Sequence, residues 1–114
     1  MASRTSGELR HPAAAEIVFA DVLVALSDPI RLAIVAALHA NDQLPCSAFD
    51  LPVSKSTRSW HFRVLREAGI IQQRDEGIRR LNTLRREDLE GRFPGLLDLA
   101  IAESRRERVP IKII

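Results

Sequence analysis

The chain has 114 residues, of which 46% are hydrophobic, and its formal net charge is +2. This length is typical of one small domain, which buries a low fraction of its surface and therefore gains from association with a second copy. No apolar run reaches the roughly 18–20 residues of a membrane span, and the first residues lack the apolar core of a secretory signal. The chain has one cysteine, Cys46, which excludes an internal disulfide, so we expect a cytoplasmic protein with no membrane partner.

The N-terminal part of the chain is predicted to contain a tail and two helices. Residues 1–12 are polar and aperiodic, and we expect them to be a flexible tail. Apolar residues recur at helical spacing over residues 13–26, which predicts a first helix. A second helix is predicted over Pro29–Ala40, with Asp28 as its N-cap and Pro29 in its first position. Because this second helix is apolar on nearly all sides, it should be central.

The next part of the chain predicts a short element followed by a longer helix. The segment from Ser47 to about Leu51 is poorly patterned and predicts at most one or two helical turns. A longer helix is predicted over Lys55–Ala68, capped by Ser54 and ended by Gly69. This helix presents a stripe to the core that consists of Phe62, Leu65 and Ala68.

The hydrophobic period changes after this helix. The segments Ile70–Asp75 and Ile78–Leu84 are predicted to form two short strands. Glu76 and Gly77 lie at the turn between them, where glycine can take a positive φ. The sequence therefore predicts a β-hairpin with a polar tip.

The C-terminal part of the chain predicts further helix. A helical turn is expected over 86–90, a break at 93–95, a last helix over 96–108, and a C-terminal tail over 109–114. The element order is therefore helix, helix, short helix, helix, β-hairpin, helix. This order predicts a mainly α (α+β) winged helix-turn-helix over residues 13–108, in which the second helix of the pair enters the DNA major groove and the hairpin is the wing.

Positive charge is concentrated in the predicted helix and wing. Residues 54–86 carry nine Lys or Arg and three acidic residues, a net charge of +6, whereas the rest of the chain carries a net charge of −4. A charge run is usually only a solvated surface. Because this run coincides with a DNA-binding architecture, it favours a face that binds nucleic acid.

Three stretches of sequence resemble the ArsR/SmtB family of bacterial repressors. ALSDPIRLAIVAAL (Ala25–Leu38) is similar to the second helix of that family, and SKSTRSWHFRVLREAGII (Ser54–Ile71) is similar to its recognition helix. REDLEGRFPGLL (Arg86–Leu97) resembles the tail of a branch without evident metal ligands. The similarity covers roughly Ala14 to Ile101, which is most of the chain.

The resemblance implies a bacterial, cytoplasmic homodimer that represses transcription by occupying a palindromic operator on double-stranded DNA. It also suggests an unidentified small-molecule inducer that changes the geometry of the dimer. Pairing in the family is mainly through the first and last helices. The dimer interface is therefore expected to contain Ile17, Val18, Val22, Leu96, Leu97, Leu99 and Ala100.

The residues that contact DNA are expected at the start of the recognition helix and on the hairpin. Short hydroxyls at a helix N-terminus suit phosphates and base edges, and arginines at a hairpin suit phosphates or a narrow minor groove. Asp75 and Glu76 lie among these arginines and are expected to cancel part of their charge. The expected DNA-binding residues are Ser54, Lys55, Ser56, Thr57, Ser59, Trp60, Arg63, Arg74, Arg79 and Arg80.

Two positions depart from the family pattern. Arg58 stands where a Val or Leu usually faces the core, so we expect either a side chain that extends outward or a rotated helix. Trp60 replaces a His that often points to DNA, and contact with DNA and partial burial elsewhere are equally open for it. His61 is expected to be packed and hydrogen-bonded rather than a ligand. An intrahelical ion pair competes with a phosphate contact for Arg66.

Neither a metal site nor an active site is expected. Metal sensors of the family use a Cys-x-Cys pair or paired Asp and His ligands, whereas here the region reads PCSAFD and no His follows His61. The sequence contains no phosphate-binding loop, nucleophile elbow or zinc-hydrolase spacing, so we expect no cofactor and no enzymatic activity. The remaining alternatives are a winged-helix interaction module without specific DNA binding, and a thiol or ligand sensor that uses Cys46.

Overall fold

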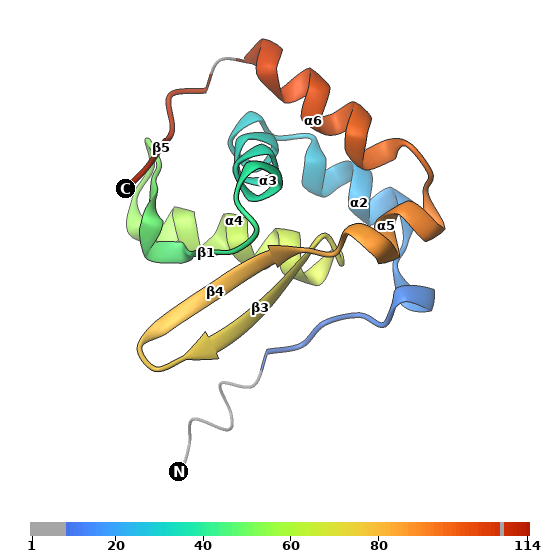
Figure 1. The fold of residues 1–114 in the computed structure, drawn as a ribbon, viewed down its shortest axis with the longest axis horizontal. Helices are drawn as coiled ribbons and strands as arrows, with labels where there is room; N and C mark the ends of the chain where they lie inside the picture. Colours follow the sequence, from blue (N-terminus) through green and yellow to red (C-terminus); the bar gives the residue numbers. More distant parts are fainter. Residues whose placement is uncertain (1–8, 108) are drawn as a thin grey trace.

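The computed structural model describes residues 9–107 and 109–114 and confirms the predicted α+β winged-helix class. Helices surround α3, and a hairpin of strands β3 and β4 extends from them (Figure 1). The elements in chain order are η1 (Ala14–Glu16), α2 (Phe19–Leu26), α3 (Pro29–Ala40), β1 (Leu44–Pro45), η2 (Cys46–Ala48), β2 (Phe49–Asp50), α4 (Lys55–Glu67), β3 (Ile71–Glu76), β4 (Arg79–Leu84), α5 (Arg86–Arg92), α6 (Leu96–Glu107) and β5 (Lys112–Ile113).

The first predicted helix is interrupted. Instead of one helix over residues 13–26, the chain forms the short 3₁₀ helix η1, an extended pair at Ile17 and Val18, and then α2. Both residues of the pair are β-branched, which favours extended backbone. The break also points Ile17 into the core, where its side chain lies against Gly69. Helical periodicity alone did not reveal this interruption.

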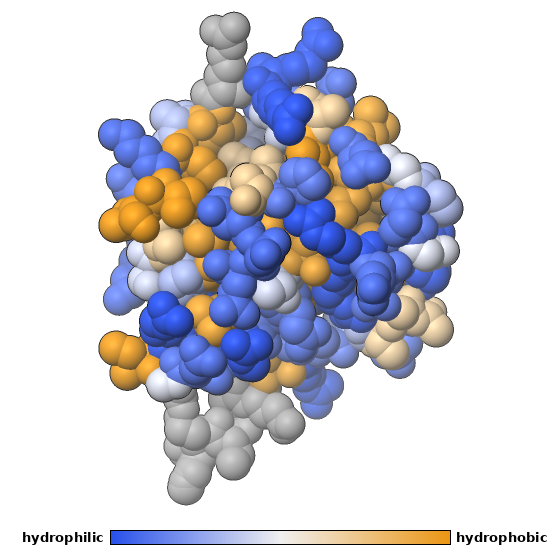
Figure 2. Space-filling model, in the orientation of Figure 1, coloured by the Kyte–Doolittle hydropathy of each residue, from blue (hydrophilic) through white to orange (hydrophobic). Residues whose placement is uncertain are grey.

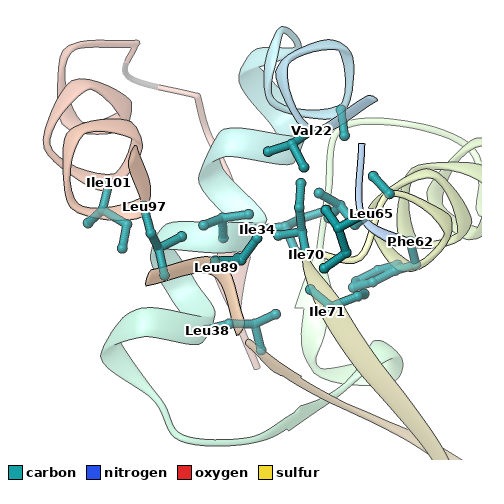
Figure 3. Packing of buried hydrophobic residues seen from close by; sticks show 14 of the residues in the cluster. Val22, Ile34, Leu38, Phe62, Leu65, Ile70, Ile71, Leu89, Leu97 and Ile101 are labelled. Carbon is teal, nitrogen blue, oxygen red and sulfur yellow. The ribbon is translucent and has the colours of Figure 1, made fainter. Parts of the chain in front are cut away.

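Helix α3 is central, as predicted. The Asp28 carboxylate accepts hydrogen bonds from the backbone N–H groups of Ile30 (2.8 Å) and Arg31 (3.1 Å), and Pro29 occupies the first turn. Figure 3 shows side chains of α3, α4, α5 and α6 meeting in one core. The most deeply buried residues of α3 are Ile34, Val35 and Leu38.

In place of the one or two helical turns allowed for residues 47–51, the chain forms only a single 3₁₀ turn. The 3₁₀ helix η2 lies between β1 and β2, so most of this segment is extended. Phe49 of β2 is buried and packs edge-on against Phe62 of α4, with ring centroids 5.2 Å apart. Pairing of β2 with β5 (Lys112–Ile113) holds the segment extended there.

Helix α4 has the expected beginning, inner face and end. The Ser54 hydroxyl accepts a hydrogen bond from the Thr57 N–H (3.2 Å), and Gly69 ends the helix region with φ +90°. A Cβ atom on Gly69 would lie 2.6 Å from Cγ1 of Ile17, so the chain needs glycine there. The predicted inner stripe is buried and consists of Phe62, Leu65 and Ala68.

Strands β3 and β4 form the predicted hairpin. They pair antiparallel from Ile71 and Leu84 at the base to Glu76 and Arg79 at the tip, and the sheet has the order β1-β4-β3. Gly77 has φ +63° in the turn. The hairpin points away from the helices, as Figure 1 shows, and is the wing.

The two chain ends contact the body where they are described. Of the predicted tail 1–12, residues 1–8 lie outside the described part of the chain. In the remaining part, Nε2 of His11 accepts a hydrogen bond (2.9 Å) from the Gln73 N–H of β3. At the other end, α6 is described to Glu107, and Arg108 lies outside the description. The segment expected as a C-terminal tail ends in β5, which pairs with β2.

None of the helices in the described part of the chain is long and apolar enough to cross a membrane by itself. Helices α2 and α3 reach the required length and composition only as a pair, which is bent by 99°.

Candidate nucleic-acid interface

The outer face of α4 presents a continuous stripe of side chains to solvent. Ser56, Ser59, Trp60 and Arg63 are spaced by three or four residues, so they share one face of the helix. All four are exposed. The stripe combines hydroxyl, aromatic and cationic groups, which are the types that contact base edges and phosphates in a DNA groove.

The start of α4 carries a small network of hydroxyl groups. Ser54 donates to Oγ1 of Thr57 (3.0 Å), and its oxygen lies 3.3 Å from that of Ser56. Lys55 and Ser56 are exposed, whereas Thr57 is half-buried. Ser54 and Thr57 therefore fix the beginning of the helix, while the exposed Lys55 and Ser56 are accessible to a ligand.

Trp60 is held in place by a buried arginine. Its side chain is 46% exposed, and the Arg31 guanidinium lies 5.2 Å from the ring centroid in a cation–π arrangement. The indole therefore packs against the protein on one side and remains available to a ligand on another. In this position the exposed side of Trp60 could contact DNA, as expected from the sequence.

Arg31 joins three helices beneath the interface. Its Nε donates to the carbonyl oxygen of Ala25 (2.6 Å) and its Nη2 to that of Val24 (3.3 Å), at the end of α2. Its Nη1 donates to Nδ1 of the buried His61 (3.0 Å) in α4. Sequence patterns did not identify Arg31 as part of the site, because its partners lie on two other helices.

His61 is a packed residue in the structure, as expected. Burial lowers the pKa of its imidazole below the usual value, the charge of Arg31 lowers the pKa further, and Asp28 acts against both. Because a guanidinium only donates hydrogen bonds, Nδ1 must carry no proton when it accepts from Arg31. The neutral imidazole is therefore the form that supports α4.

Arg58 and Arg66 are both half-buried, so neither presents its whole guanidinium to solvent. The Nε atom of each is buried and has no hydrogen-bond partner. Nη1 of Arg66 donates to Oε1 of Gln73 in β3 (2.7 Å), while its ion pair with Glu67 is longer, 3.9 Å. Burial lowers the pKa of Arg66. Arg66 thus ties α4 to the wing, and the expected intrahelical pair is the weaker of its two contacts.

The arginines of the wing are paired with acids. Arg74 and Arg79 lie 3.3 and 3.6 Å from the carboxylate of Glu76, and Nε of Arg80 lies 2.8 Å from Asp75. The hydrogen bond that Arg80 donates to Asp75 raises the pKa of the Arg80 guanidinium. The expected local cancellation of charge is therefore present. Because the pairs are exposed, each should be weak enough to exchange for a phosphate.

A cleft of about 380 Å³ separates α4 from the wing. Lys55 and Ser59 of α4 form one side, and Gly77, Ile78 and Arg80 of the wing form the other. Cationic groups thus stand on both sides of the cleft. A polyanionic strand that ran along it would meet α4 and the wing together.

Cys46 forms part of the floor of this cleft and is half-buried. Its sulfur accepts hydrogen bonds from Asn82 (3.3 Å) and Gln73 (3.8 Å), and burial raises the pKa of the thiol. A raised pKa keeps the group as a thiol, which is the less nucleophilic form. This environment fits a packed residue better than a reactive one.

The residues expected at a dimer interface divide into two groups. Ile17, Val22, Leu97 and Ala100 are at most 9% exposed in the single chain, where they pack in its own core. The other three offer surface to a second chain: Val18 and Leu99 are exposed, and Leu96 is half-buried.

No group of three or more His, Cys, Asp or Glu in the described residues could hold a metal ion. The described histidines have structural partners instead. Nδ1 of His39 lies 2.7 Å from a guanidinium nitrogen of Arg86, while His11 and His61 have the contacts given above.

An exposed stripe on the second helix of a helix-turn-helix, next to a basic hairpin, defines a winged helix-turn-helix domain of the DNA-binding kind. Residues 26–74 match the family model described as "Helix-turn-helix domain". The chain is also 34% identical, over 82 residues, to the "Uncharacterized HTH-type transcriptional regulator YceK" of Bacillus subtilis (strain 168), an alignment that covers 69% of this chain and 82% of the relative. The chain belongs to the HTH-type transcriptional regulators, and its function is DNA-binding regulation of transcription.

Proposed function

We propose that this regulator is a sequence-specific repressor of the ArsR/SmtB type that binds a palindromic operator as a homodimer. The observation that carries the proposal is the stripe of Ser56, Ser59, Trp60 and Arg63 on α4, beside the cleft that leads to the wing. A helix with this surface suits the major groove, and the cleft suits the phosphate strand beside it. Residues 13–108 carry both DNA binding and dimerisation in this proposal.

Exposed apolar side chains of α2 and α6 support dimerisation. Phe19 is 48% exposed and Leu99 is 60% exposed, and together with Phe93 and Leu96 they line an apolar groove of about 510 Å³. Small domains rarely leave such surface in water unless it binds something. A second copy would cover it with the same surface, which is the usual arrangement in a twofold dimer.

Repression and release follow from the spacing of the two recognition helices. On DNA, the helices of a dimer contact half-sites about 34 Å apart, which is one helical turn. A ligand that binds at the dimer interface with different affinity for two dimer geometries shifts this spacing. An inducer of this kind would lower operator affinity without touching α4.

The proposal is tested with a duplex that the wild-type protein selects from a random pool. Ser56→Ala should weaken binding to this duplex more than to scrambled DNA, because it removes a contact to base edges. Lys55→Met should weaken both and reduce the log–log salt slope by about one for each protomer, because it removes one phosphate contact per protomer. Arg105→Met on α6 is the matched control and should change neither. Selection of no sequence by the wild type would contradict the proposal.

The two alternatives make different predictions. An interaction module without specific DNA binding would enrich no sequence from the pool. A sensor based on Cys46 would lose operator affinity after thiol alkylation, and a Cys46→Ser variant would resist the treatment. The raised pKa of this thiol disfavours the second alternative.

A further inference from the structure

The tip of the wing carries an apolar side chain where turns usually carry polar ones. Ile78 forms the turn with Gly77, between the paired residues Glu76 and Arg79. Its side chain is fully exposed, at 104% of the reference value. Turn positions favour Gly, Asn, Asp, Ser and Pro, so a β-branched apolar residue at this place has no local structural advantage. Figure 2 shows an isolated hydrophobic spot among hydrophilic atoms at this end of the molecule.

The surroundings of Ile78 are suited to a polyanion. Arg74, Arg79 and Arg80 lie on the two strands just behind the tip, together with Asp75 and Glu76, so the tip has a net charge of +1. This charge, together with the cleft that the tip shares with Lys55 and Ser59 of α4, favours DNA over an uncharged bilayer or an apolar protein surface as the partner of the tip. Ile78 is the exposed apolar residue between these charged strands.

The position of the tip relative to α4 sets which groove it meets. Gly77 and Ile78 line the same cleft as Lys55 and Ser59 at the beginning of α4. When α4 lies in the major groove and a phosphate strand follows the cleft, the far side of the cleft faces the adjacent minor groove. That groove is about 6 Å wide, which admits single side chains more readily than a whole hairpin.

We propose that Ile78 is an apolar wedge that enters the minor groove, partly unstacks one base step and bends the operator. Proteins that bend DNA insert Ile, Leu, Phe or Met side chains in this way. The wedge would favour flexible pyrimidine–purine steps, so the wing would contribute to specificity without a hydrogen bond to a base. The inference rests on the proposed function, because it requires a bound operator.

The test uses the duplex that the wild-type protein selects from a random pool, in two labelled forms. Donor and acceptor dyes at the two ends report bending, and 2-aminopurine at the step nearest the wing reports unstacking. Ile78→Ser removes the wedge, whereas Ile78→Met keeps an apolar side chain of similar length. Since Ile78 is fully exposed, neither substitution affects the core.

We expect bending and raised 2-aminopurine fluorescence with the wild type and with Ile78→Met, and loss of both with Ile78→Ser. Affinity should fall about tenfold in Ile78→Ser with an unchanged salt slope, because no phosphate contact is removed. Specific binding in which wild type and Ile78→Ser give the same bend and fluorescence would overturn the wedge alone. Failure of the wild type to select any sequence would instead overturn the proposed function, and the wedge with it.

Discussion

Nη1 of Arg31 donates a hydrogen bond to Nδ1 of His61 across 3.0 Å, and this contact joins the beginning of α3 to the middle of α4. The same guanidinium lies under Trp60 and also binds two carbonyl groups at the end of α2. The position of the recognition helix thus depends on one buried cation. Replacement of Arg31 should therefore lower the free energy of unfolding and change the environment of the Trp60 indole.

Arg31→Met should lower the free energy of unfolding by about 2–4 kcal/mol, because it leaves buried hydrogen-bonding groups without a partner. Urea denaturation followed by the fluorescence of Trp60, the single tryptophan, measures this change. Arg105→Met, an exposed substitution on α6, is the control and should change stability by less than about 0.5 kcal/mol. Equal stability of the two variants would show that the Arg31 contacts are not structural.

Stability should fall as the pH is lowered below about 6.5. The pKa of His61 in the folded chain lies below its usual value of 6.5, which represents the unfolded chain. Well above pH 6.5 the imidazole is neutral in both states. As the pH falls through 6.5, the unfolded state takes up the proton first, so the folded state loses stability until the pH passes the lowered pKa. His11, whose pKa burial also lowers, should add to the same effect.

The pH dependence is measured as the urea midpoint between pH 7.5 and pH 5. His61→Asn keeps an acceptor for Arg31 but cannot take up a proton, so its midpoint should fall less than that of the wild type in this range. His11→Asn should remove a further part of the slope. An unchanged profile in His61→Asn would contradict the assigned role of the neutral imidazole.

Gly69→Ala should destabilise the fold, whereas Gly91→Ala should not. The first places a Cβ 2.6 Å from Ile17 at a residue with φ +90°, and should destabilise the fold by about 2 kcal/mol or more. The second lies in α5, where a Cβ meets nothing within 4 Å, and should be neutral or stabilising by up to about 1 kcal/mol. Thermal melts of both variants test the packing of the η1–α2 break against the end of α4. A tolerated alanine at position 69 would show that Ile17 can move aside.

Leu99→Ser should weaken the proposed dimer. Leu99 is exposed and lines the apolar groove, so its truncation removes apolar area from the interface and should raise the dimer Kd at least about tenfold. Sedimentation velocity over a concentration series measures the change. Ile78→Ser removes an equally apolar, exposed side chain far from the groove's lining residues, and should leave the dimer intact. A monomeric wild type would contradict the dimer proposal.

The sequence predicted the elements whose ends carry local chemical markers. Asp28, Ser54 and Gly69 marked helix boundaries correctly, because capping and positive φ are properties of single residues. The break at Ile17 and Val18 was missed, since it depends on packing against Gly69, a residue about fifty positions away.

The candidate site contains residues of both kinds, some predictable from local pattern and some not. Exposure of Lys55, Ser56, Ser59 and Arg63 follows from helix periodicity, so the outer face of α4 could be predicted. Periodicity does not reveal which apolar residues of a helix are buried in its own chain, so it could not predict the burial of Ile17, Val22, Leu97 and Ala100, which are expected at a dimer interface. The role of Arg31 required tertiary contacts between α2, α3 and α4.

The measurement that tests the central proposal most directly is fluorescence anisotropy of the wild-type protein with its selected duplex and with a scrambled duplex of the same composition, at about 0.15 M salt. We predict at least about a thousandfold tighter binding to the selected duplex, as is usual for specific DNA-binding proteins. Equal and weak binding to both duplexes would contradict the proposed function. It would mean that α4 and the wing form a basic surface that binds DNA without recognising its sequence.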